Sequence, residues 1–207
     1  MPKRGGDGSP GRRLQLSHRG SSILSTSLQV AFGKFVSVRF GAEAWSKLLH
    51  DSALNASMDL ASAGNRGDAL ALLLMATARV TSEQSAAVLE ELGAFLAGQL
   101  LSRYRERIDP AWTTIDLVAF ASRALALWFA RNETAHLPAM RCIRTGERAM
   151  RIVYASRRRL CPLIRGLIFG AAQRRGETLV WTEERCLLKG ASFCEILVEL
   201  QGRAPAA

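Results

Sequence analysis

The chain has 207 residues, a net charge of +10, 48% hydrophobic residues and 22% charged residues. This length and composition favour one globular domain with its own core. No apolar run approaches the ~18 residues of a membrane-spanning helix, and the basic N-terminus lacks the apolar segment of a signal peptide. We therefore expect a cytoplasmic protein without membrane contact, whose four cysteines are thiols or metal ligands rather than disulfides.

Residues 1–22 are predicted to form a disordered basic arm. The first twenty residues contain five Lys or Arg, one Asp, five Gly and two Pro, a composition that cannot bury a core. Further along, three arginines follow one another at 157–159. This charge permits an alternative function, that of a basic adaptor without cofactor that binds nucleic acid or an acidic protein. Nucleic acid is the less expected partner, because no zinc-finger or basic-zipper pattern is present.

A helical lobe is predicted for the first part of the chain, because apolar residues recur at helical spacing through residues 22–131. The first helix ends at Gly41, and two shorter helices are expected at 42–54 and 68–79. Thr81 and Gln84 form a capping box, which predicts the start of a long helix that ends before Asp109. A further helix is expected at 114–130.

After Pro138 the apolar spacing becomes that of strands. Two short strands are predicted within residues 139–156, and two more within 177–186 and 192–200. A helix is expected between the two pairs at 157–173, with Ser156 as its N-cap. The order predicts an α+β fold, a helical lobe followed by a β-β-α-β-β unit with a four-stranded antiparallel sheet. The domain would span residues 23–200 and leave a disordered tail at 201–207.

Tyr154, Ser156 and Arg158 form the pattern Y-x-S-x-R. Two hydroxyl groups and a guanidinium at this spacing suit the binding of carboxylates, because arginine can donate two parallel hydrogen bonds. A structural interpretation is also open: Ser156 would cap the helix, Arg158 would face water, and Tyr154 would fill the space between sheet and helix.

Several segments occur together in the order of a known family: VRFGAEAWSKLLHDSAL, VLEELGAFLAGQLLSRY, PAMRC, YASRRRL and RGLIFGAA. Over about residues 25–200 they resemble the haem nitric-oxide/oxygen-binding (H-NOX) family, whose fold is a helical lobe plus a four-stranded antiparallel sheet with a helix. By this resemblance Tyr154, Ser156 and Arg158 would clamp the haem propionates, and Pro138 would border the pocket. The family's proximal histidine lies thirteen residues before that proline, at Leu125 here, and leucine has no lone pair for iron.

The resemblance implies a sensor domain that responds to a diatomic gas or another small ligand. A separate signalling protein, such as a kinase or a cyclase, would be the partner, because no output segment follows the last strand. We do not expect an enzyme, because the sequence contains no G-x-S-x-G, HExxH or glycine-rich phosphate loop.

Three cysteines form a second group. Cys186 and Cys194 bracket a hairpin connection, so their thiols should face each other, and Cys161 starts the neighbouring helix. The spacing is similar to that of bacterial H-NOX proteins in which three cysteines and a histidine bind zinc, with Glu183 here in place of the histidine. A zinc site of Cys161, Glu183, Cys186 and Cys194 is therefore one hypothesis, with oxidation, zinc release and a disulfide as a switch. The alternative is that the thiols are core residues.

Overall fold

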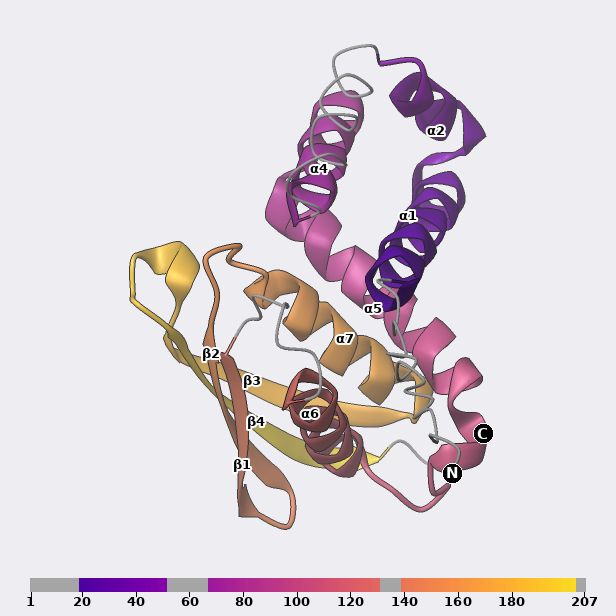
Figure 1. Cartoon of the computed structure of the whole chain (residues 1–207). Helices are drawn as coiled ribbons and strands as arrows, with labels where there is room; N and C mark the ends of the chain where they lie inside the picture. The colour runs from indigo at the N-terminus through magenta and orange to yellow at the C-terminus, as the bar shows by residue number, and fades with distance from the viewer. Residues whose placement is uncertain (1–18, 52–66, 131–138, 204–207) are drawn as a thin grey trace, which may run out of the picture.

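The computed structural model describes residues 19–51, 67–130 and 139–203 (Figure 1). The helices are α1 (Arg19–Phe40), α2 (Ala42–Leu49), α4 (Gly67–Thr81), α5 (Ser85–Arg103), α6 (Thr114–Ala130) and α7 (Cys161–Arg174). The strands are β1 (Ala139–Gly146), β2 (Ala149–Ala155), β3 (Glu177–Arg185) and β4 (Cys194–Arg203). The predicted α+β order of elements is therefore confirmed. Helix α1 begins within the predicted arm, and β4 includes the first three residues of the predicted tail.

The four strands form one antiparallel sheet in the order β1-β2-β4-β3. Alternate residues of β2 are buried, and Tyr154 on this buried face pairs with Met140 of β1 and Cys194 of β4. Side chains of α6 and α7, among them Ile115 and Ile168, pack into the same core. One face of the sheet is thus covered by these two helices (Figure 1).

A second core holds the N-terminal helices together. Phe32 and Val36 of α1, Leu48 of α2 and Leu92 of α5 are buried in it. Helix α1 ends where the sequence predicts, because Gly41 adopts a φ of 90° that favours glycine. None of the helices in the described part of the chain is long and apolar enough to cross a membrane.

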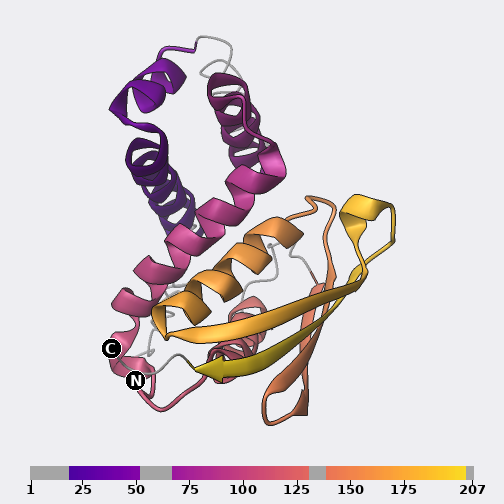
Figure 2. The ribbon, with the colours of Figure 1, turned by 180° about the vertical axis from the view of Figure 1, so that it is seen from behind.

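Helices α5 and α7 join the two cores by unusually close contact, and they run side by side in both views (Figures 1 and 2). Glycines on both helices permit this approach. A Cβ atom on Gly166 would lie 1.8 Å from the carbonyl oxygen of Glu90, and one on Gly93 would lie 2.3 Å from that of Leu163. The backbones of the two helices are therefore in direct contact.

The N-terminal end of α6 is fixed to the sheet by two polar groups. Thr113 and Asp116 form a capping box in which the Asp116 carboxylate accepts the Thr113 N–H at 2.8 Å and also binds Arg144 of β1. The carboxylate of Glu177, buried at the start of β3, accepts both the N–H and the hydroxyl of Thr114, at 2.8 and 2.6 Å.

Two predicted helix caps are wrong. Helix α7 begins at Cys161 rather than 157, and its N-cap is Leu160, which makes no side-chain cap bond. Ser156 instead accepts the N–H of Arg158 at 3.2 Å within a turn, and Arg159 has a φ of 49° that interrupts a helical path. Pro162 fits the first turn of the helix, which is why the helix starts there.

The capping box expected from Thr81 and Gln84 does not form either. Thr81 is the last residue of α4, and its hydroxyl donates to the carbonyl of Thr77 at 2.8 Å. Gln84 occupies the N-cap of α5 without a side-chain hydrogen bond. The threonine is already engaged by the preceding helix, so it cannot cap the next one.

We predict that Gly166→Ala destabilises the protein by about 3 kcal/mol or more, because the new methyl group meets the rigid backbone of α5. Gly202→Ala in β4 is the matched control, since a Cβ there meets nothing within 4 Å. Urea unfolding of both variants measures the difference. Equal free energies of unfolding for the two variants would contradict the close contact.

Asp116→Asn should lower the free energy of unfolding by about 1 kcal/mol at neutral pH. Burial alone would raise the pKa of Asp116, but hydrogen bonds from Thr113 and Arg144 hold it below the ordinary value. A carboxylate with a lowered pKa stabilises the fold above its unfolded pKa and loses this effect as pH falls through the folded pKa. The difference between wild type and variant should therefore shrink below about pH 4. A constant difference down to that pH would argue against the charge of Asp116.

Candidate functional site

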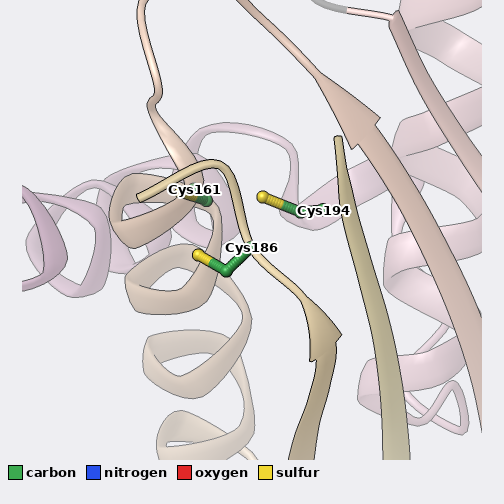
Figure 3. Close-up of side chains that lie close together, drawn as sticks. All are labelled: Cys161, Cys186 and Cys194. Atoms are coloured by element: carbon green, nitrogen blue, oxygen red, sulfur yellow. The ribbon is translucent and has the colours of Figure 1, made fainter. Parts of the chain in front are cut away.

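Three cysteine side chains converge where α7 begins and where β3 and β4 meet (Figure 3). Cys161 is the first residue of α7, Cys186 follows β3, and Cys194 is the first residue of β4. Their sulfur atoms all lie within 4.8 Å of one another, and the three residues are 3%, 5% and 0% exposed. We call these three residues the cysteine cluster.

The local backbone explains why the sulfurs meet. Arg185 pairs with Glu195 in the β3–β4 ladder, so the residues just beyond this pair, Cys186 and Cys194, lie opposite each other. The connection between them is tight: the Cys186 carbonyl accepts the N–H groups of Lys189 and Ala191 at 3.0 and 3.1 Å. The expectation that these two thiols face each other is borne out by this geometry.

Two thiols of the cluster, those of Cys161 and Cys194, favour the protonated form. Burial raises the pKa of Cys161, and the neighbouring Cys194 and Cys186 raise it further. Burial also raises the pKa of Cys194, although the Leu187 N–H, which donates to its sulfur at 3.3 Å, works against this. The Cys161 thiol donates to the carbonyl of Arg159 at 3.7 Å. A cation that binds here must therefore displace protons from the sulfurs.

The spacing of the three sulfurs suits a tetrahedral cation such as zinc. Zn–S bonds of about 2.3 Å place the sulfurs of a tetrahedral site about 3.8 Å apart. Sulfurs that already lie within 4.8 Å of one another need only small side-chain movements to reach that spacing. The donor set fits zinc, with three of four positions supplied by thiolates.

Glu183, the fourth ligand expected from the sequence, has other partners in the structure. It lies on the helix-facing side of β3, by the alternation of buried and exposed residues along that strand. One carboxylate oxygen accepts a hydrogen bond from Lys189 at 3.0 Å, and the other accepts one from the Trp181 indole at 3.4 Å. Among the described acidic side chains none belongs to the group formed by the three sulfurs.

The residues of the Y-x-S-x-R pattern lie at the end of β2 and in the turn that follows. The Tyr154 hydroxyl is buried near Ser156 and the Leu160 backbone, but it makes no hydrogen bond of good geometry to any described residue. Burial raises the pKa of Tyr154. Arg158 is exposed, and Ser156 uses its hydroxyl within the turn. Tyr154 thus retains an unused hydroxyl that a bound anion could meet.

The residues present do not fit a haem held by the family's proximal histidine. Leu125, the residue that we expect at that position, lies in α6 and has no donor atom, and Pro138 lies outside the described residues. In the described ranges the one histidine is His50, whose Nδ1 lies 2.8 Å from the carbonyl of Ser46 at the end of α2. His18 and His136 belong to segments that the structure leaves undescribed.

Two features beside the cysteine cluster are not predicted from the sequence. The N–H of Leu187 points at the Cys194 sulfur, and Gly190, with a φ of 90°, closes the connection between the strands. The glycine four residues after Cys186 was the available signal, because a left-handed position in a short connection favours glycine. Cys142, the cysteine outside the cluster, is half-buried on β1 and packs against the sheet core.

The chain is similar to a known family in sequence and in structure. The model of the haem-NO-binding family matches residues 27–182. An H-NOX protein from S. oneidensis in the Fe(II)NO ligation state is similar with a TM-score of 0.67 and 22% identity, over 84% of this chain and 98% of that chain.

An Fe(II) unliganded H-NOX protein from K. algicida is similar with a TM-score of 0.67 and 13% identity, over 87% of this chain and 98% of that chain. No curated protein matches the chain. At these identities the solved structures establish the fold, while the family match extends over most of the sequence. The chain therefore belongs to the haem-NO-binding (H-NOX) family of sensor domains.

Proposed function

We propose that this chain is a sensor domain whose responsive element is the cysteine cluster, and that it passes a redox signal to a separate signalling protein such as a kinase or a cyclase. The observation that carries the proposal is the convergence of three buried sulfurs within 4.8 Å of one another. A histidine-ligated haem is not part of the proposal, because Leu125 has no donor atom for iron.

In the reduced state Cys161, Cys186 and Cys194 would hold zinc as thiolates. Glu183 would complete the four-coordinate site after leaving Lys189 and Trp181, and a carboxylate in place of a thiolate or imidazole makes a weaker ligand. Zinc supplies no redox chemistry of its own, but it keeps the thiols deprotonated and ties the start of α7 to the ends of β3 and β4. The Leu187 N–H stabilises the charge on the Cys194 sulfur.

Oxidation by a peroxide would open the cluster. Two thiolates lose one electron each as an S–S bond forms, while the O–O bond of the peroxide breaks. The two electrons, with two protons taken up from the buffer, convert hydrogen peroxide to two water molecules. The remaining thiolate and Glu183 hold a cation too weakly to retain it. A thiol reductant reverses the step.

The position of the cluster explains how such a change could reach a partner. Cys161 begins α7, and α7 lies in backbone contact with α5 through Gly166 and Gly93. Because that contact is rigid, a shift at the start of α7 would move α5 and the helices packed on it. A partner could read this movement on the helical lobe.

We expect the full chain, purified under reducing conditions, to contain about one zinc per molecule and to release it on peroxide treatment. Elemental analysis and a zinc-sensitive dye measure both quantities. Cys186→Ser should lower zinc content severalfold, while Cys142→Ser, which changes a cysteine outside the cluster, should retain it. Thiols inert to peroxide in a protein without metal would leave only core cysteines and refute the switch.

The protein purified from a haem-replete host should lack the Soret band of a histidine-ligated haem, because residue 125 is leucine. An absorption spectrum with a haem assay tests this. A strong band at one haem per chain that is lost in His136→Ala and kept in Leu125→Ala would show that another histidine serves as ligand. In that case haem, and not the cysteine cluster, would be the responsive element.

A further inference from the structure

We propose that a groove on the helical lobe, separate from the cysteine cluster, binds a small amphipathic anion such as a fatty carboxylate or an alkyl phosphate. Two open depressions of about 590 and 520 Å³ make up this groove. They share Phe95 of α5 as a common wall. We call the whole the amphipathic groove, and it stands independently of the proposed function.

One half of the groove is mostly apolar. Its lining comes from α1, α2 and α5: Val30, Gly33, Val38, Trp45 and Phe95 are apolar, and Lys34 and Ser37 of α1 are polar. Val30 and Val38 are 55% and 76% exposed, so two branched apolar side chains face water along one stripe of α1. The Trp45 ring lies directly on Gly33, where a Cβ atom would be 2.8 Å from a ring carbon. This half suits a hydrocarbon body.

The other half is cationic. It is lined by Phe95, Gly98, Gln99, Ser102 and Arg103 of α5 and by Arg174 at the end of α7. The α5 residues are spaced three and four apart and therefore form a single face of the helix. The Arg174 guanidinium rests on the bare backbone of Gly98, since a Cβ atom there would lie 2.4 Å from the guanidinium carbon.

The charge of the two arginines is only partly offset by their surroundings. In the described part of the chain neither Arg103 nor Arg174 has a carboxylate partner, whereas Arg165 one helix face away pairs with Glu90. Both arginines lie at helix C-termini, and each macrodipole supplies only about half a negative charge. A positive charge of about one unit therefore remains in this half of the groove.

The chemistry of the two halves selects the ligand. Two guanidinium groups, with the Ser102 hydroxyl and the Gln99 amide beside them, recognise the oxygens of a carboxylate or phosphate. Phe95 lines both depressions, so a ligand whose head group lies at the arginines can place its chain past Phe95 along Val30 and Val38. A simple inorganic anion would contact only the cationic groups of the groove, and a neutral alcohol would gain only its apolar contacts.

Calorimetric titration of the full chain with decanoate tests the site. We expect saturable binding of one decanoate per chain, with acetate and decanol each at least about tenfold weaker, the loss expected when one set of contacts is missing. An alkyl phosphate of the same length should bind comparably. Decanol as tight as decanoate, or binding only to vesicles of anionic lipid and not to monomeric decanoate, would overturn the proposal.

Gly98→Ala is the sharpest variant, because its methyl group displaces the guanidinium of Arg174, the mobile end of a side chain, and leaves the core untouched. We expect unchanged or higher thermal stability together with about tenfold weaker decanoate binding, as for Arg174→Gln. Val38→Glu should weaken binding while retaining the fold, since Val38 is 76% exposed.

Arg105→Gln removes the same charge outside the groove and serves as the control. It should bind decanoate as wild type does. If it weakens binding as much as Arg174→Gln, the effect is one of net charge and the groove is not a site.

Discussion

The backbone contact between α5 and α7 is the constraint on which the rest of the structure depends. Gly93 on one helix and Gly166 on the other leave no room for even a methyl group, so the two helices cannot slide or rotate without breaking contact. Helix α5 carries the core of the helical lobe, and α7 covers the sheet. The two cores are thereby fixed to each other, and anything that moves α7 must also move α5.

The cysteine cluster lies at the beginning of that same helix. Its sulfurs come from the first residue of α7 and from the ends of two neighbouring strands, so a bond among them closes the helix onto the sheet. From the spacing to Pro138 we predict that the chain combines this cluster with a leucine where its family carries the iron-binding histidine. Under our proposal the sensing chemistry resides in sulfur rather than in a haem iron, and the contact between α7 and α5 carries the change to the helical lobe.

Polar contacts have a different role at the opposite end of the strands. Two carboxylates hold the start of α6, the helix that contains Leu125. Glu177 accepts the N–H of Thr114, the first residue of the helix, and Asp116 accepts the N–H of Thr113 just before it. Helix α6 is thus positioned as a fixed element even though its side chain at position 125 cannot bind iron. The amphipathic groove lies on other helices, α1, α2, α5 and the end of α7, so a ligand there would contact the helical lobe and α7 together.

The sequence alone determined the α+β class, the order of the elements and the end of α1 at Gly41. It also determined that Cys186 and Cys194 lie opposite each other. Each of these follows from local spacing or from a turn residue. Residue type alone excluded a histidine ligand at position 125. Tertiary structure decided the start of α7, since the left-handed Arg159 and the place of Pro162 prevail over the capping preference of Ser156. Tertiary structure also placed the Cys161 sulfur near the other two sulfurs. It formed the hydrogen bond between Lys189 and the Glu183 carboxylate, and it packed the Arg174 guanidinium on the backbone of Gly98. These contacts join residues far apart in the chain or depend on side-chain competition, and no local pattern encodes them.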